Sequence, residues 1–349
     1  MIVLVNKQLI TNTKKAQFVL GFLFLFISCE KSLNNYNFSG NTMGTSYTIK
    51  LNFAYTSHHR SVIEKGIDSI LINLNQQMST WIKDSEISLF NRTRSTEPYK
   101  ISNEFFYVLQ QGKLLNKKTD GAFDYTIFPL AEIWGFGPAV KNIIEIPNKS
   151  DLEKVLKYVG INKVVLNYPF IKKIHPNTKI DLNAIAKGHA VDVLHNWLVQ
   201  KGFSNVFVEI GGEIRCSGKN LDKKIWNVGI DTPNKSSIPG QEVFSIISLD
   251  NKAIATSGSY RNFRVNDART INHTIDPISG NAVETDIVSV SVIAEDCLIA
   301  DAWATALMVL TYEEGLKKVN NDETIEALWI ILKEEDNVFE NFSSAGFFN

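Results

Sequence analysis

Two oxygen-bearing side chains, Asp301 and Thr305, stand four residues apart in a stretch with helical character. In a helix this spacing places both side chains on one face, so that a carboxylate and a hydroxyl can approach one point. Mg²⁺ takes such hard oxygen ligands and commonly shares them with substrate phosphates. The same spacing also suits a surface aspartate and a threonine that bonds its own helix. Other residues must therefore decide between a metal site and a plain helix face.

A second group lies in the segment 181–188, where a predicted strand runs into a predicted helix. Backbone N–H groups at a helix start attract anions, and Lys187 adds a positive charge there. The segment can bind a phosphate, or it can be an ordinary helix start with an exposed lysine. Gly211-Gly212 ends another apolar strand, and it either lets the backbone approach a ligand or forms a simple turn.

The segments 255–258 and 273–277 supply hydroxyls, an imidazole and a carboxylate. No G-x-S-x-G sequence surrounds Ser257, which argues against a serine hydrolase. His273 has an unperturbed pKa of about 6.5 and can accept a proton at neutral pH. Asp276 can orient that imidazole or approach a metal ion, and the sequence does not choose between these roles.

The elements that must position these residues follow from hydrophobic periodicity and turn signals. Alternation predicts a strand over 47–53, helical spacing predicts a helix over 62–74, and Ser150–Glu153 reads as a capping box. The region from 213 to 293 reads as mostly strand and turn. Further strands are expected over 163–168, 171–175, 179–183, 204–210 and 325–332, and further helices over 185–200, 297–310 and 312–320. Strands and helices do not alternate strictly, which favours an α+β fold over a doubly wound sheet.

Composition sets the broad class. The chain has 349 residues, 44% of them hydrophobic, and a net charge of −1, which suits a globular protein and argues against nucleic acid as the main partner. The length would allow two domains, but no linker is evident, so one compact body is expected. Three cysteines are too few for a disulfide scaffold. Cys216 and Cys297 could pair or could remain buried thiols.

The N-terminus has the pattern of an export signal. Lys14 and Lys15 precede the apolar run 18–27, and Ser28-Cys29 follows directly. This run is too short for a transmembrane helix, which needs about 20 apolar residues. The segment Phe26–Cys29 resembles the lipobox of bacterial lipoproteins, which implies that Cys29 carries lipid, including palmitate. A plain signal peptide and an uncleaved anchor are the alternatives.

We therefore expect four segments: a lipoprotein signal peptide over 1–28, a tether over 29–41, a folded body over 42–335 and a C-terminal tail over 336–349. The protein would be exported and anchored by lipid to a bacterial membrane, facing the periplasm. The sequence does not tell the inner membrane from the outer, and it does not reveal the oligomeric state.

The order of the motifs carries more information than any one of them. The chain closely resembles the ApbE family from about residue 40 to 332. The resemblance rests on these segments: Thr42–Thr45, Met78–Trp81 with Ser85–Ser88, Gly121–Asp124, Ala186–Gly188 with Asp192, Gly211–Glu213, Thr256–Gly258, His273–Gly280 and Asp301–Thr305. It implies a T-fold-like body of mixed, mostly antiparallel sheet with packed helices.

The resemblance also implies a function for the body over 42–335. Family members are FAD:protein FMN transferases, which move FMN from FAD to a Thr or Ser hydroxyl of an acceptor flavoprotein through a phosphodiester bond and release AMP. It implies Mg²⁺ ligands at Ala184 (backbone carbonyl), Asp301 and Thr305, and FAD contacts from Met43, Trp81, Ala122, Phe123, Asp124, Lys187 and Ile275. His273 and Asp276 are the candidate catalytic residues. The acceptor would be a subunit of a membrane redox complex.

The chain departs from the family pattern in details that spare the proposed metal ligands. Trp81 stands where a tyrosine is common, His189 replaces a tyrosine, and Glu213 replaces an aspartate. These changes bear on substrate preference more than on reaction class. Two other functions fit the same motifs: hydrolysis of FAD to FMN and AMP, and a lipoprotein that binds FAD without converting it.

Overall fold

The structure is a computed structural model that describes residues 33–138, 146–233, 240–259, 263–266, 269–272, 274–333 and 338–348. Its centre is an eight-stranded sheet in the order β1-β2-β6-β7-β10-β13-β14-β15, in which every neighbouring pair is antiparallel. The strands are β1 (Asn34–Thr42), β2 (Thr45–Phe53), β6 (Asn205–Ile210), β7 (Glu213–Ser217), β10 (Ala253–Gly258), β13 (Ile287–Ala294), β14 (Ile325–Lys333) and β15 (Val338–Ser343).

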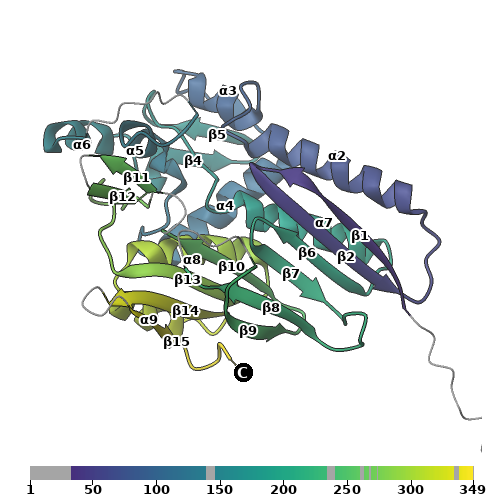
Figure 1. Ribbon diagram of the computed structural model, residues 1–349. Helices are drawn as coiled ribbons and strands as arrows, with labels where there is room; N and C mark the ends of the chain where they lie inside the picture. Colours follow the sequence, from purple (N-terminus) through teal and green to yellow (C-terminus); the bar gives the residue numbers. More distant parts are fainter. Residues whose placement is uncertain are drawn as a thin grey trace, which may run out of the picture.

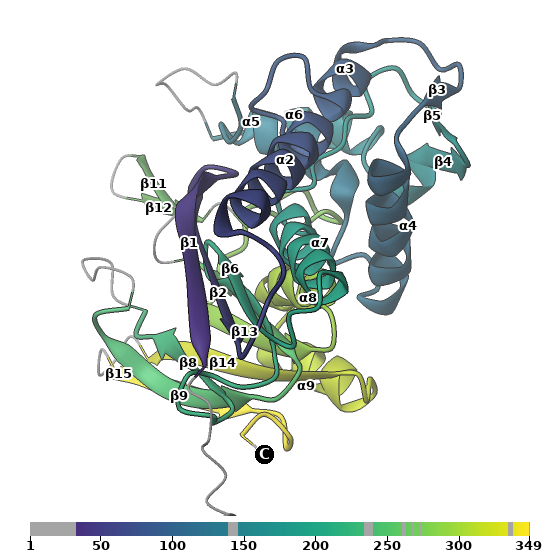
Figure 2. The same ribbon diagram turned by 90° about the vertical axis from the view of Figure 1, so that its right-hand side faces the viewer.

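Both faces of this sheet are covered, which explains why β13 and β14 are apolar along most of their length. Alternate side chains enter different cores: Ala253 and Ala255 face the main core with the helices, while Ile254 joins a second core. That second core lies under the hairpin of β8 (Trp226–Asp231) and β9 (Val243–Leu249). Figure 2 shows the helices and this hairpin on opposite sides of the sheet.

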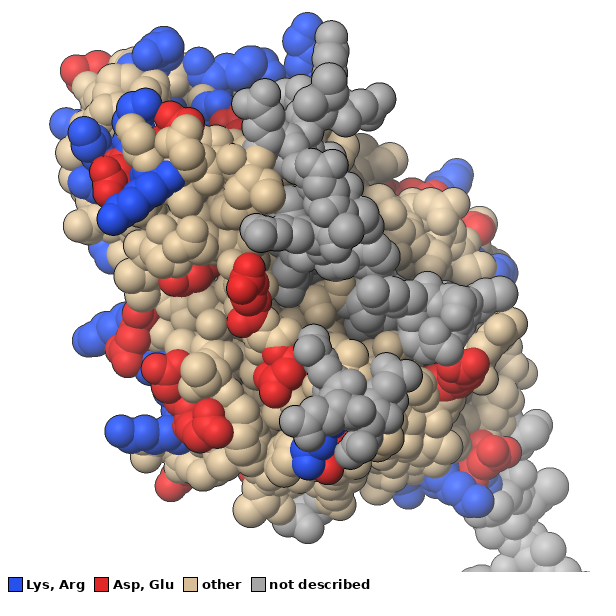
Figure 3. Space-filling model, turned by 60° about the vertical axis from the view of Figure 1, so that its left-hand side comes forward, with Lys and Arg blue, Asp and Glu red and all other residues tan. Residues whose placement is uncertain are grey.

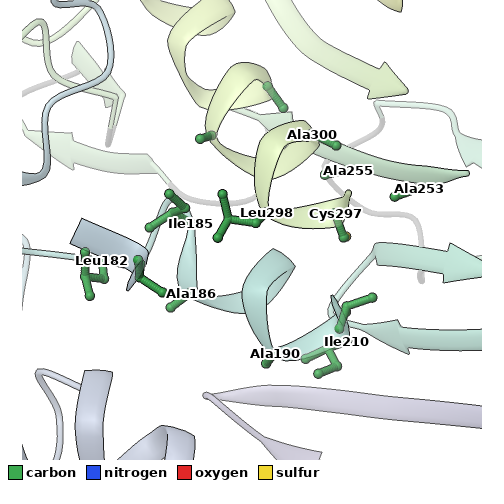
Figure 4. Close-up of a cluster of buried hydrophobic side chains, with 14 of the residues drawn as sticks. Leu182, Ile185, Ala186, Ala190, Ile210, Ala253, Ala255, Cys297, Leu298 and Ala300 are labelled. Atoms are coloured by element: carbon green, nitrogen blue, oxygen red, sulfur yellow. The ribbon is translucent and has the colours of Figure 1, made fainter. Parts of the chain in front are cut away.

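Two helices lie against the middle of the helical face: α7 (Ala186–Gln200) and α8 (Cys297–Val309) (Figure 1). Small side chains let them pack closely. Figure 4 shows Ala186 and Ala190 of α7 near Cys297, Leu298 and Ala300 of α8, all buried. The outer helices are α2 (Arg60–Met78), α4 (Asn103–Lys118) and α9 (Tyr312–Asn320).

A smaller layer beside this core carries the remaining elements. It contains α3 (Glu86–Arg92), η2 (Tyr125–Ile127), α5 (Phe128–Ile133), α6 (Lys149–Leu156), η3 (Ile161–Lys163), a sheet of β3 (Tyr99–Lys100), β5 (Phe170–Lys173) and β4 (Val164–Asn167), and a hairpin of β11 (Phe263–Asn266) and β12 (Arg269–Asn272). The α+β prediction is confirmed, with one body of mostly antiparallel sheet and packed helices.

Several local predictions need correction. Residues 34–41 form most of β1, paired in full register with β2, so the expected tether over 29–41 is wrong for them. In the expected tail over 336–349, residues 338–343 form the edge strand β15, and Phe347 is buried. The segment 179–183 is not a strand. Ser150–Glu153 is not a capping box, because α6 is capped by Asn148, whose side chain accepts the Asp151 N–H.

The two cysteines in the described part of the chain, Cys216 and Cys297, are buried free thiols. Cys29 lies outside the described residues. Within the described ranges no helix is both long and apolar enough to cross a membrane.

Candidate functional site

The first turns of α7 and α8 meet at the helical face of the sheet and bring three charged side chains together. Lys187, in the first turn of α7, pairs with Glu213, the first residue of β7. Its Nζ lies 3.8 Å from Asp301 Oδ1, one turn into α8. Both carboxylates are buried, while the lysine side chain keeps 28% of its surface exposed. The cluster therefore consists of a partly exposed lysine side chain whose ammonium contacts two buried carboxylates.

The electrostatics keep this lysine charged. Burial alone would lower the pKa of Lys187, but the carboxylates of Asp301 and Glu213 outweigh it and raise that pKa. Burial raises the pKa of both Asp301 and Glu213, and the ammonium of Lys187 opposes the rise. Glu213 Oε2 is buried and has no hydrogen-bond partner among the described residues. The ammonium of Lys187 is the one positive charge in this cluster, and such a charge can attract an anionic group such as a phosphate.

Gly188 lets the two helices touch. Its N–H donates to Asp301 Oδ2 at 2.9 Å. A Cβ on this residue would lie 2.7 Å from the carbonyl carbon of Cys297 and 2.8 Å from Asp301 Cβ, inside ordinary contact distance. Only glycine allows this approach without moving a helix.

The predicted metal ligands lie around this contact. The Gly188 N–H, which in a continuing helix would donate to the Ala184 carbonyl, donates to Asp301 instead. No hydrogen bond within the described residues is accepted by that carbonyl, so it is available to a cation. Thr305 Oγ1 lies 3.2 Å from Ser257 Oγ at the end of β10. The helix α8 carries Asp301 and Thr305 on one face, as their spacing predicts.

The donor set fits Mg²⁺. It consists of one carboxylate, one hydroxyl and one backbone carbonyl, all hard oxygens, and Mg²⁺ is usually held by one or two carboxylates together with waters and substrate phosphates. In the described part of the chain no three His, Cys, Asp or Glu side chains cluster in a way that could form a closed metal cage.

Two hairpin turns border the cluster. Met43-Gly44 joins β1 to β2, and Gly211-Gly212 joins β6 to β7. All four residues have positive φ, which glycine adopts without strain and Met43 adopts here at 48°. Gly211 N donates to the Ser46 carbonyl at 3.1 Å, so the turns are neighbours. Met43, a predicted FAD contact, is thus placed at the same end of the sheet as Glu213.

The predicted contacts at 122–124 have structural tasks. The side chains of Ala122 and Phe123 are buried in the main core. Asp124 caps η2, and its Oδ1 accepts the Thr126 N–H at 2.7 Å. Burial raises the pKa of Asp124. This segment can therefore present backbone atoms to a ligand, but the side chains of Ala122 and Phe123 point into the core.

The carboxylate of Asp276 accepts hydrogen bonds from backbone groups of its own turn. Its Oδ1 accepts the Ile278 N–H at 2.9 Å, and its Oδ2 accepts the Ser279 N–H at 3.1 Å. The predicted roles of Asp276, metal binding or orienting His273, stay predictions. Ile275 is buried in a third core beneath the turn. A Cβ on Gly121 would meet Ile278, so the turn packs against the 121–124 segment. His273 itself lies outside the described residues.

Sequence reasoning missed a cavity of about 700 Å³ beside Trp81. Three aromatic residues line it, Trp81, Phe128 and Tyr158, together with the cationic residues Lys83, Arg92, Arg94 and Lys179. The rim residue Trp81 is 67% exposed. Figure 3 shows Lys and Arg side chains gathered along the upper edge of the molecule, where α3 lies in Figure 1. Cations spread over three segments leave no local motif, which is why the sequence did not reveal them.

One stretch of chain joins this cavity to the charged cluster. Thr80 also lines the cavity, and its Oγ1 is buried with no hydrogen-bond partner among the described residues. The chain then runs directly from Lys179 at the cavity to Lys187, and Asn91 holds its start by two hydrogen bonds of 2.8 Å to the Ile180 backbone.

Comparisons with known proteins identify the family of this chain. The model of the ApbE family matches residues 43–329. A Vibrio cholerae FAD:protein FMN transferase is 37% identical over 94% of this chain and 96% of its own length.

Two solved structures are also similar. The flavin transferase ApbE from Vibrio cholerae has a TM-score of 0.80 at 36% identity, covering 90% of this chain and 98% of that one. The Pseudomonas stutzeri flavinyl transferase ApbE, in its apo form, has a TM-score of 0.82 at 30% identity, covering 90% and 97%. With a family model that matches residues 43–329 and a relative 37% identical over nearly its whole length, the chain belongs to the ApbE family.

Proposed function

We propose that this protein is a FAD:protein FMN transferase. It moves the FMN half of FAD onto a Thr or Ser hydroxyl of an acceptor flavoprotein. The acceptor oxygen forms a bond to the FMN phosphorus, the bond from that phosphorus to the AMP oxygen breaks, and the hydroxyl proton leaves. The observation that carries the proposal is the cluster of Lys187, Asp301 and Glu213 at the crossing of two helix starts.

Different residues of the chain would bind different parts of FAD. Lys187 offers its charge to the pyrophosphate, and the buried Glu213 keeps the ammonium at that place. Trp81 has an exposed ring that can stack on an aromatic ligand at the cavity. Phosphoryl transfer needs mainly positioning and charge neutralisation, and these residues are of the types that can supply both.

We infer that Mg²⁺ completes the site at Ala184, Asp301 and Thr305. Bound there, the ion would neutralise negative charge on the phosphoryl oxygens. His273 is the proposed base for the acceptor hydroxyl, because an imidazole accepts a proton near neutral pH.

The N-terminal pattern supports a location. We propose that Cys29 carries the lipid that anchors the protein to a bacterial membrane on its periplasmic side. The acceptor would then be a subunit of a membrane redox complex.

One experiment separates this function from its two alternatives. The protein is incubated with FAD, Mg²⁺ and an acceptor flavoprotein, and the acceptor is weighed by mass spectrometry while AMP is measured. A gain of one FMN on the acceptor, matched by AMP, supports transfer. AMP and free FMN without acceptor modification indicate a pyrophosphatase. Bound FAD that stays intact indicates a carrier protein.

The metal is tested on Thr305. Thr305→Val keeps the shape and removes the oxygen, so the Mg²⁺ concentration for half-maximal transfer should rise about 10-fold or more, whereas the matched variant Thr305→Ser keeps the oxygen and should stay near wild type. Transfer that is unchanged by Mg²⁺ removal would contradict the metal assignment.

A further inference from the structure

The helices α7 and α8 both begin without a cap of their own. The residue at the α7 N-cap is the apolar Ile185, and Asp296 at the α8 N-cap makes no side-chain cap hydrogen bond. The first N–H groups of a helix have no partner within it, and leaving them buried and unpaired is costly. Something outside each helix must therefore accept these hydrogen bonds.

Each helix is capped by an aspartate of the other. Asp192, in the second turn of α7, accepts the Cys297 N–H on Oδ1 at 2.9 Å and the Leu298 N–H on Oδ2 at 2.8 Å. In return Asp301 of α8 accepts the Gly188 N–H of α7 at 2.9 Å. Gly188 and Asp192 are four residues apart on one face of α7, so the two contacts lie side by side.

Both capping carboxylates are buried: Asp192 is 7% and Asp301 3% exposed. Arg215 of β7 supplies the charge that Asp192 needs, with Nη1 2.6 Å from Asp192 Oδ1 and 2.7 Å from Asp296 Oδ1. Asp296 shares the arginine but is half exposed and caps nothing. Asp192 is thus tied to three elements at once, α7, α8 and β7.

We propose that Asp192 is a positioning residue that sets α8 against α7 and thereby places Asp301 and Thr305 for metal binding. This inference rests on the proposed function. Without the Asp192 carboxylate, the first turn of α8 loses two charge-assisted hydrogen bonds. Asp301 lies only three residues after Leu298, so a shift of that turn also disturbs its bond with Gly188.

The test compares Asp192→Asn with Asp296→Asn in the full chain. Both variants remove one negative charge beside Arg215, but only the first removes a cap, because an amide nitrogen cannot accept an N–H. Amide hydrogen exchange is measured by NMR at Leu298 and Gly188, and binding of Mn²⁺, as a probe for Mg²⁺, is measured by titration calorimetry. Transfer kinetics supply kcat and the KM for FAD.

In Asp192→Asn, exchange should accelerate at both amides, Mn²⁺ affinity should fall about 10–100-fold, and kcat should fall while the KM for FAD changes little. In Asp296→Asn all of these should stay near wild type. Exchange at Gly188 and Mn²⁺ affinity that stay at wild-type values in Asp192→Asn would overturn the proposal, and so would equal effects of the two variants.

Two further measurements keep the test decisive. If Asp192→Asn does not fold, Arg215→Lys replaces it, because this variant keeps the positive charge but binds the Asp192 carboxylate less firmly. Amide exchange at Gly188 should then accelerate several-fold. Exchange at the wild-type rate there counts against the proposal. If the wild-type protein binds no Mn²⁺, the metal part of the proposed function is wrong, and exchange at Gly188 in Asp192→Asn alone decides whether Asp192 positions Asp301.

Discussion

Gly188→Ala is the most direct perturbation of the helix contact on which the site depends. The added Cβ would clash most severely with the carbonyl oxygen of Cys297. It would also lie about 0.6–0.7 Å inside ordinary contact distance from Asp301 Cβ and from the carbonyl carbon of Cys297. The carbonyl cannot move without α8, so the two helices must separate by at least this distance. The bond from the Gly188 N–H to Asp301 would lengthen accordingly.

The expected effect on stability is small and the effect on turnover is large. Overpacking costs about 1–3 kcal/mol, while alanine in place of glycine in a helix recovers up to about 1 kcal/mol. The net loss of unfolding free energy should thus be about 0–3 kcal/mol. A displacement near 1 Å can cost about 10²-fold in rate, so transfer should slow about 10–100-fold.

The assay pairs urea unfolding with transfer kinetics over a Mg²⁺ titration. Gly66→Ala is the matched control: its Cβ in α2 would meet the end of the Trp197 side chain and no backbone atom. This control should lose some stability and keep wild-type Mg²⁺ dependence. Wild-type turnover and Mg²⁺ dependence in Gly188→Ala would refute the reasoning, because they would show that the close approach of α7 to α8 is not needed.

Three other predictions concern different parts of the chain. Burial lowers the pKa of His195 to about 4, so between pH 6.5 and 4 the unfolded chain takes up a proton that the folded protein does not. Between pH 7 and 4 the wild type should therefore lose about 3 kcal/mol more of its unfolding free energy than His195→Gln. Parallel pH profiles of the two proteins would contradict this. His273→Ala should lower transfer about 10²–10⁴-fold with little change in FAD affinity, whereas weak FAD binding with a normal rate at saturation would remove His273 from catalysis. Cys29→Ser should release the protein from the membrane fraction, and retention there would contradict lipid anchoring.

Local patterns predicted much of the fold correctly. Alternating apolar residues located β2 and β6, and helical spacing located α2 and α7, because these elements bury one face and their periodicity shows it. Strand β1 was not predicted, because its Asn-rich sequence lacks the alternating pattern. Its pairing with β2 uses backbone groups that any residue provides. Edge strand β15 was not predicted for the same reason: its side chains are half-exposed or exposed, so no buried face shows in its sequence.

The site shows the same division. The i, i+4 placement of Asp301 and Thr305 on α8 followed from sequence. The turn held by Asp276 and the burial of Ala122 and Phe123 did not, because a motif shows which residues recur together and not which atoms are already occupied.

The sequence by itself determined the order of elements, the family motifs and the residue types available for chemistry. Only the tertiary structure decided which of them meet. Asp192 and Leu298 are 106 residues apart, and Gly188 and Asp301 are 113 apart. Hydrogen bonds across such separations depend on how two helices pack on one sheet, which is set by the burial of apolar surface along the whole chain and leaves no local signal at the residues that the packing brings into contact.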